Sequence, residues 1–203
     1  MTKQTAHGAR IRPILFSTAM VQAILEGRKT QTRRVVKPQS AILTDRMARS
    51  LGVQPPAQEN PASIPCPYGQ PGDILWVRET WGYYADTWGD ANYFEYKGSF
   101  TGINDDVIVS EPKWKPSIHM PFESARIFLR IKAVRVERLQ DISTEDCLSE
   151  GLSTTLREHD AVVHLSQQWE QLWQSINGPE SWDANPWVWV PEFQRVSREE
   201  AGL

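Results

Sequence analysis

The sequence predicts an α+β fold with a small closed or nearly closed sheet, and three observations support this prediction. Apolar strand candidates lie near both ends of the chain, at residues 11–16 and 187–193. A longer strand candidate, residues 126–139, alternates apolar and polar positions and then shifts phase after Ile131. Such a shift indicates a bulge or a bend around a barrel. The helix candidates are short, which favours packing of helices over one small sheet.

The N-terminal elements follow in chain order. Residues 1–11 are predicted to form a loose tail, and the first strand runs over residues 11–16. Ser17 or Thr18 is placed to cap a helix whose apolar residues share one face, and Gly27 is placed to end it.

Two insertions are expected in the middle of the chain. Residues 38–71 are rich in Pro, Gln, Ser and Ala and read as a long insertion. A Pro-Gly-Asp turn at 71–73 then opens a strand over residues 74–79. Residues 82–116 form the second insertion, with aromatic residues, Gly and Asp but no clear period apart from short strand candidates near 93–96 and 107–109.

The C-terminal half begins with a capped helix. Ser143 is a cap, Asp146 stands where a capping box places its acid, and Gly151 should end this helix. A second helix is predicted from about residue 160 to 176, with Leu, Trp and Ile side chains at helical spacing. Together these elements predict a single domain over residues 12–195, followed by a C-terminal tail at 196–203.

Composition narrows the class of protein. A chain of 203 residues with 40% hydrophobic and 23% charged residues can build a sizeable core. The two cysteines, Cys66 and Cys147, are too few for a disulfide framework and do not have metal-binding spacing. No signal peptide or membrane span is recognised. A cytoplasmic protein without metal is therefore expected.

The most informative feature is a local cluster of positive charge. Five of the ten residues from 28 to 37 are cationic, namely Arg28, Lys29, Arg33, Arg34 and Lys37, and none is acidic, although the whole chain has a net charge of -3. Such a cluster suits an anionic or nucleotide-like ligand. It also lowers the pKa of a lysine within it, which makes the amine a usable base. The ordinary alternative is a solvated charged face.

Three motifs, in this order, resemble the ASCH domain family. They are Ile24-Leu-Glu-Gly-Arg-Lys-Thr-Gln-Thr-Arg33, the Pro-Gly-Asp turn that opens a strand, and the short helix that ends at Ser149-Glu150-Gly151. The chain resembles a longer form of the family, found in ASCH proteins carried by bacteriophages and prophages, at Trp81, at Trp114-Lys-Pro-Ser-Ile-His-Met-Pro121 and at Ile176-Asn-Gly178. The resemblance implies a PUA-like fold, which is a mixed β-barrel with packed short helices, and an association with RNA or nucleoside chemistry.

The resemblance also implies an activity and a set of residues. Small bacterial members of the family hydrolyse N4-acetylcytidine to cytidine and acetate. Their catalytic lysine falls on Lys29, their nucleophilic threonine on Thr32 and their catalytic glutamate on Glu150. No metal or organic cofactor is implied, and a monomer is favoured. The two insertions are absent from the small hydrolases and could reshape the pocket, which leaves the substrate open. Other ASCH proteins are reported as ribonucleases, so a metal-independent ribonuclease stays open as an alternative, as does a non-catalytic RNA-binding module.

The chemistry of the three residues agrees with those roles. Thr32 can supply an oxygen nucleophile, Lys29 can accept its proton when neutral, and Glu150 can orient Lys29 or pass a proton to the leaving amine. The structural alternatives are a threonine that simply favours a strand and an exposed glutamate in a last helical turn, where the helix dipole disfavours an acid.

Further residues are candidates for binding RNA or a nucleotide. Trp81 and Tyr83 follow a strand end, where a stacking platform for a base could lie, although a core role is about as well supported. His119 is a possible ligand-facing group or a structural histidine. The complete predicted set for RNA or nucleotide binding is Arg28, Arg33, Arg34, Trp81, Tyr83 and His119.

Overall fold

The computed structural model describes residues 3–4, 8–37, 65–85, 92–101, 103–104, 107–108 and 112–203. It divides into two compact units. Unit 1 comprises Met1–Gly27, Gly72–Ile131 and Gln194–Leu203, and unit 2 comprises Arg28–Pro71 and Lys132–Phe193.

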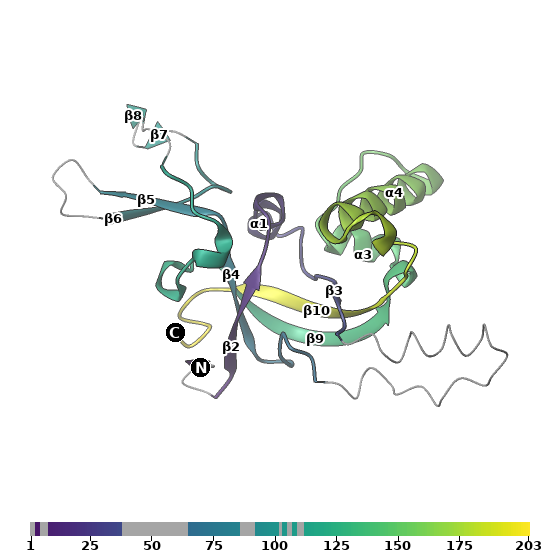
Figure 1. Cartoon of the computed structure of the whole chain (residues 1–203), viewed down its shortest axis with the longest axis horizontal. Coiled ribbons are helices and arrows are strands. Elements are labelled where there is room, and N and C mark those ends of the chain that lie inside the picture. Colours follow the sequence, from purple (N-terminus) through teal and green to yellow (C-terminus); the bar gives the residue numbers. More distant parts are fainter. Residues whose placement is uncertain are drawn as a thin grey trace. The chain divides into compact units, whose positions relative to one another are not determined.

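The described residues of unit 1 form paired strands, one α-helix and two short 3-10 helices (Figure 1). The strands of its sheet are β1 (Lys3–Gln4), β2 (Arg10–Leu15), β4 (Ile74–Arg78) and the first part of β9 (Phe128–Arg138). β2 pairs with β1 antiparallel and with β4 parallel, and β4 pairs with β9 antiparallel. Residues of these strands take part in a buried apolar cluster, with members Ile11, Ile74, Trp81, Met120, Ala125, Phe128, Val196 and Ala201.

Helix α1 (Thr18–Leu25) confirms the helix predicted after the first strand. The Ser17 hydroxyl accepts a hydrogen bond from the backbone N–H of Met20 at 3.4 Å, as expected for an N-cap. Gly27 follows the helix with a φ of 76°, a left-handed conformation that glycine adopts without steric strain. The cationic cluster therefore begins directly after a helix end.

The predicted second insertion contains two small antiparallel sheets. One pairs β5 (Trp81–Ala85) with β6 (Asn92–Tyr96), and the other pairs β7 (Ile103–Asn104) with β8 (Val107–Ile108). Two short 3-10 helices follow, η2 (Ser117–His119) and η3 (Phe122–Ser124). The strand candidates near 93–96 and 107–109 thus correspond to β6 and β8.

The described residues of unit 2 combine two α-helices with strands. Its elements are β3 (Arg34–Val35), the later part of β9, η4 (Leu139–Asp141), α3 (Thr144–Ser149), α4 (Glu158–Asn177), η5 (Pro179–Ser181) and most of β10 (Trp187–Val196). β3 pairs antiparallel with β10. The buried apolar cluster of this unit has the members Leu139, Cys147, Leu165, Trp169, Trp173, Val188 and Val190.

Helix α4 bears out the predicted apolar stripe at most of its positions. Leu165, Trp169 and Trp173 are buried, and Leu172 packs against the same cluster. Ile176, at the end of the stripe, is 55% exposed. The helix ends at Gly178, whose φ of 96° stops the helical path.

The mixed α/β architecture agrees with the predicted α+β class, but the described residues do not form a closed barrel. The hydrogen-bonded strand order is β1-β2-β4-β9-β10-β3, with β1 and β3 at its two ends, and β9 and β10 run through both units. The long strand β9 continues through the predicted phase shift, with Val134 and Val136 half-buried.

Both segments predicted as tails contain residues of the fold. Strand β2 begins at Arg10, inside the segment predicted as the N-terminal tail. Val196 is the last residue of β10, and Ala201 is buried within the predicted C-terminal tail. Most of the insertion predicted at residues 38–71 lies outside the described residues, which resume at residue 65.

Candidate functional site

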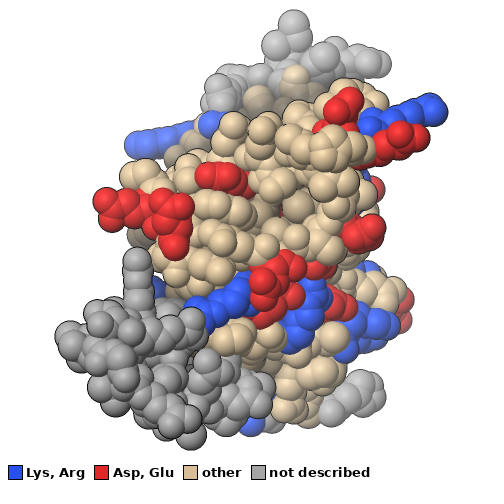
Figure 2. Space-filling view, turned by 90° about the vertical axis from the view of Figure 1, so that its right-hand side faces the viewer, with Lys and Arg blue, Asp and Glu red and all other residues tan. Residues whose placement is uncertain are grey.

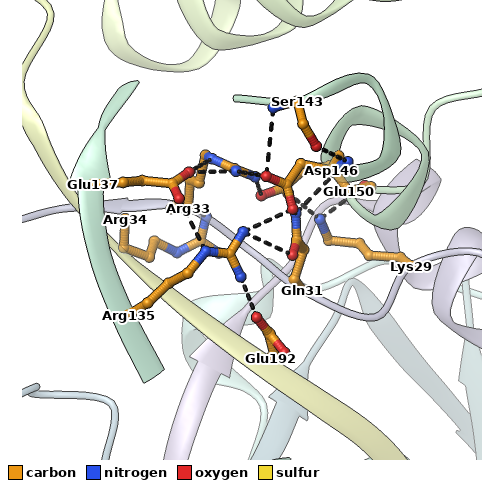
Figure 3. A network of polar contacts seen from close by, with 10 residues as sticks. All are labelled: Lys29, Gln31, Arg33, Arg34, Arg135, Glu137, Ser143, Asp146, Glu150 and Glu192. Carbon is orange, nitrogen blue, oxygen red and sulfur yellow. Dashed lines mark hydrogen bonds and ion pairs between the residues drawn. The ribbon is translucent and has the colours of Figure 1, made fainter. Parts of the chain in front are cut away.

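The segment that carries the cationic cluster runs between the end of α3 and β10, within unit 2 (Figure 3). Lys29 forms a β-bridge with Glu150, and Gln31 forms one with Glu192. The backbone N–H of Thr30 donates to the Ser149 carbonyl at 2.8 Å, and the Thr30 carbonyl accepts from the Phe193 N–H at 2.8 Å. Backbone hydrogen bonds on both sides therefore fix where each cation points.

Lys29 and Glu150, which lie 121 positions apart in the sequence, are in direct contact. The Lys29 Nζ donates to Glu150 Oε2 at 2.6 Å and to the Glu150 carbonyl oxygen at 2.9 Å. The two side chains are 0% and 2% exposed. The resemblance assigns both residues to one catalytic site, and the fold brings them together.

Arg33 holds the other oxygen of the same carboxylate. Its Nη1 donates to Glu150 Oε1 at 3.0 Å, its Nε donates to Glu137 Oε1 at 2.9 Å, and its Nη2 donates to Asp146 Oδ2 at 2.9 Å and also contacts Glu137. The Arg33 side chain is 0% exposed, and its guanidinium lies 5.7 Å from the ring centroid of Trp169. The Glu150 carboxylate is thus held between two buried cations.

The network continues to the surface through Arg135. Its Nη2 donates to Asp146 Oδ1 at 2.7 Å, its Nε donates to Glu137 Oε2 at 2.9 Å, and its Nη1 contacts Glu192. Arg135 and Glu192 are 34% and 41% exposed, whereas Lys29 and Arg33 are fully buried. Figure 2 shows a band on one face of the protein in which Lys and Arg side chains are intermixed with Asp and Glu. The surface band therefore carries both signs of charge.

Helix α3 positions Asp146 and Glu150, the two acids on this helix that accept hydrogen bonds from Arg33. The Ser143 hydroxyl accepts from the Asp146 N–H at 3.1 Å, and Asp146 Oδ2 accepts from the Ser143 N–H at 3.5 Å, which confirms the predicted capping box. Glu150 is the C-cap, one residue before Gly151 with its φ of 95°. The helix dipole disfavours an acid at that end, and Lys29 and Arg33 offset the effect.

Removal of the Ser143 cap should destabilise helix α3, which carries Asp146 and Glu150. We expect Ser143→Ala to lower the free energy of unfolding by about 1 kcal/mol, because the Asp146 N–H loses its acceptor. Urea unfolding monitored by tryptophan fluorescence measures this change. Ser143→Asn keeps a capping oxygen and should stay close to the wild type. Equal stability of the wild type and Ser143→Ala would show that the hydroxyl does not stabilise α3.

Burial and neighbouring charges set the proton affinities in the network. Burial lowers the pKa of Lys29 below its ordinary value of 10.5, against the opposing effect of Glu150, and Arg34 and Arg33 lower it further. Burial also lowers the pKa of Arg34. The pKa of Asp146 is lowered because hydrogen bonding from Gln31 and the charges of Arg33 and Arg135 outweigh partial burial. These shifts favour an ionised Asp146 and an amine at Lys29 that loses its proton more readily.

Cys147 is the buried residue of α3, belongs to the apolar cluster of unit 2 and is not a reactive thiol. Burial raises the pKa of its thiol to about 11. Because the thiolate is the nucleophilic form, a raised pKa makes this cysteine inert at neutral pH.

Thr32, the third predicted catalytic residue, lies between Gln31 and Arg33. It is 1% exposed, and its backbone N–H donates to the Pro191 carbonyl at 3.1 Å. The side chains of Lys29, Gln31 and Arg33 all contact residues of the α3 segment, whereas the Thr32 hydroxyl makes no hydrogen bond to another described residue. The structure thus pairs Lys29 with Glu150 and leaves Thr32 outside the network.

The residues predicted to bind RNA or a nucleotide occupy varied surroundings. In unit 2, Arg28 is exposed and contacts the Gly151 carbonyl, and Arg34 is half-buried. Arg33 does not have the exposed guanidinium that a phosphate ligand requires.

The aromatic candidates belong to unit 1. Trp81 is 6% exposed and belongs to the core cluster, whereas Tyr83, which stacks on it at 6.1 Å between ring centroids, is 46% exposed. The Lys115 Nζ lies 4.1 Å from the Tyr83 ring centroid. His119 is exposed at the end of η2. Replacement of Trp81 would therefore disturb the core as well as any ligand contact.

Sequence reasoning missed four members of the network: Gln31, Arg135, Glu137 and Glu192. Arg135 and Glu137 alternate with valines on β9, and this period-2 pattern places both on one face of the strand. The available signal was a charged pair on the strand face that begins with Leu129, Ile131 and Ala133.

Within the described residues, no helix is long and apolar enough to cross a membrane. The same part of the chain contains no group of three His, Cys, Asp or Glu side chains arranged to hold a metal ion.

Comparisons with known proteins found similarity to a solved structure. No protein-family model and no curated protein matches the sequence. Among solved structures, the chain is similar to protein EF3133 from Enterococcus faecalis V583, described under the family DUF984. The two are 10% identical, the match covers 94% of this chain and 78% of that chain, and the TM-score is 0.40.

Proposed function

We propose that this chain is an ASCH-domain protein with a PUA-like fold that hydrolyses an N4-acylated cytosine nucleoside. The observation that carries the proposal is the buried contact between Lys29 Nζ and Glu150 Oε2 at 2.6 Å. The motif resemblance assigns these two residues to one site although they are 121 positions apart, and no local property of the sequence requires them to meet.

The surroundings of the pair also support a functional role. Burying two ionisable groups costs more than burying an apolar pair of similar size, so such a pair is weak evidence for stabilisation alone. A lysine with a lowered pKa beside a specific carboxylate is a typical arrangement in active sites. The alternative is a purely structural ion-pair network, which the functional assay below distinguishes.

The proposed reaction divides into two steps. The Thr32 hydroxyl attacks the acyl carbonyl carbon while neutral Lys29 accepts the hydroxyl proton. The bond between that carbon and N4 breaks, Lys29 returns the proton to the leaving N4 amine, and an acyl ester forms on Thr32. Water then hydrolyses the ester, which releases the carboxylic acid and regenerates Thr32. Glu150 orients the Lys29 amine throughout. Since Thr32 and Lys29 are not hydrogen-bonded in the free protein, this mechanism needs their approach in the substrate complex.

A second candidate is a non-catalytic RNA-binding module. It is favoured by the same network, because Lys29 and Glu150 satisfy each other and the Thr32 hydroxyl makes no hydrogen bond to either. In that case, the exposed Arg28 would contact phosphate, and its contribution would fall with added salt.

The test compares wild-type protein with Thr32→Ala on N4-acetylcytidine and on a short single-stranded RNA, with products separated by chromatography. We expect the wild type to release cytidine and acetate and Thr32→Ala to be folded but inactive. Thr30→Ala is the matched control, because Thr30 is exposed and only two residues away, and it should retain turnover.

The other outcomes each select a different conclusion. Equal turnover by the wild type and Thr32→Ala would remove Thr32 as the nucleophile. Cleavage of the RNA without hydrolysis of acetylcytidine would identify a ribonuclease. Salt-sensitive RNA binding without either reaction would identify the binding module.

A further inference from the structure

All three nitrogens of the Arg33 guanidinium donate hydrogen bonds to protein carboxylates. Nε, Nη1 and Nη2 all donate to carboxylates, and these come from Glu137 on β9, Asp146 on α3 and Glu150 at the end of α3. The side chain is 0% exposed. Four of the five N–H donors of this guanidinium are used by carboxylates, and its burial leaves no donor edge exposed to a ligand.

The contact with Glu150 divides that carboxylate between two cations. Oε1 accepts from Arg33 at 3.0 Å and Oε2 accepts from Lys29 at 2.6 Å (Figure 3). Two charge-assisted hydrogen bonds to separate oxygens fix both the position and the rotation of the carboxylate. Glu137 and Asp146 in turn fix the guanidinium.

We propose that Arg33 is a positioning residue, which holds the Glu150 carboxylate against Lys29 and shares its negative charge, and that it is not a ligand for nucleic-acid phosphate. This inference rests on the proposed function for its catalytic consequence, whereas its electrostatic consequence at Lys29 can be measured independently.

The expected effect on Lys29 follows from the charges around it. Glu150 at the end of α3 favours the protonated amine, and Arg33 and Arg34 on the same segment disfavour it. On β10, the carboxylate of Glu192 contacts Arg135. Removal of Arg33 would remove one positive charge that repels the protonated Lys29 amine. The Glu150 carboxylate would then interact with Lys29 and no longer with Arg33. Both changes raise the pKa of Lys29.

Glu137 supplies a second variant with the opposite expected sign. Among the described residues its side chain forms hydrogen bonds and ion pairs with Arg33 and Arg135, and with neither Lys29 nor Glu150. Glu137→Gln keeps the shape of the side chain but removes its charge. The positive charge of Arg33 would then be balanced by one fewer carboxylate and would interact more strongly with Glu150. Less of the negative charge of Glu150 would stabilise the protonated Lys29 amine, so the pKa of Lys29 should fall.

The experiment is an NMR titration of the side-chain carbon of Lys29 next to the amine, assigned by comparison with Lys29→Met. It is performed on wild type, Arg33→Met and Glu137→Gln, together with the pH dependence of kcat/KM on N4-acetylcytidine. We expect the pKa of Lys29 to rise by about one unit in Arg33→Met and to fall by a smaller amount in Glu137→Gln. The acidic limb of the pH profile should move in the same directions.

Shifts of opposite sign in the pKa of Lys29 support the positioning role. If Arg33 were merely structural, the two substitutions would lower stability without shifting that pKa in opposite directions. An unchanged pKa of Lys29 in both variants, or shifts of the same sign, would overturn it. If Arg33→Met does not fold, Glu137→Gln decides alone: a lowered pKa supports the proposal, and an unchanged or raised pKa overturns it. If the titrations behave as expected but the wild type does not hydrolyse acetylcytidine, the proposed function fails while the role of Arg33 at Lys29 stands.

Discussion

Glu150→Ala is expected to lower the free energy of unfolding by about 3–5 kcal/mol. The carboxylate accepts from Lys29 Nζ and Arg33 Nη1, and both of these side chains are 0% exposed. Without Glu150, two cations would stay buried next to one another with one fewer anion between them. Removal of one partner from a buried ion pair is costly for this reason, even where the intact pair contributes little to stability.

Urea unfolding of wild type and Glu150→Ala at neutral pH measures this loss. Glu145→Ala is the matched control, because Glu145 is an exposed acid in the first turn of the same helix. Only its interaction with the helix dipole is lost there, which is worth less than about 1 kcal/mol. A loss for Glu150→Ala as small as that of the control would mean that water reaches Lys29 and Arg33 and that the network is not closed.

The locally encoded parts of the site could be predicted from the sequence. The capping box of α3 depends on Ser143 and Asp146, three residues apart, and the buried stripe of α4 depends on helical spacing. Both features depend on neighbours within one or two helical turns. A single sequence contains the information that such features require.

The partners of the cationic cluster could not be predicted in this way. From residue 28 to 37 the sequence shows five cations and no acid, which reads as a positive patch. In the fold, Lys29 and Arg33 meet acids from α3 and β9 that lie 104 to 121 positions away. Charge balance of this kind is set by tertiary pairing. Composition along the chain therefore could not separate a buried, neutralised arginine from a solvated one.

The same reasoning applies to Trp81. Its position directly after a strand was compatible with either a stacking platform or the core, and residue type alone does not choose between them. Packing with Ile74, Met120 and Phe128 makes it a core residue with 6% exposure. Tyr83, two residues later on β5, keeps the exposed ring.

Lys29→Met is expected to lower kcat/KM for N4-acetylcytidine by about 10²–10⁴-fold, which is the usual contribution of a general base. Methionine is apolar and similar in length, so it fills the buried site without the amine, and Glu150 keeps its hydrogen bond from Arg33. Lys37→Met is the matched control, since Lys37 belongs to the same cluster and is exposed, and it should leave kcat/KM unchanged. Equal losses for both variants would show that total positive charge matters and not the Lys29 amine.

A second effect of Lys29→Met does not depend on any activity. The folded-state pKa of Lys29 lies below the unfolded value of 10.5, so between these two values the unfolded chain binds more protons than the folded protein. The free energy of unfolding contributed by this residue therefore rises with pH through that window, by at most about 1.4 kcal/mol per pH unit, and is lost as pH falls through the folded-state pKa. Denaturant unfolding at several alkaline pH values should show this rise in the wild type and its absence in Lys29→Met. Parallel pH dependences of the two proteins would mean that the Lys29 amine keeps its ordinary proton affinity, and its assignment as the base would then fail.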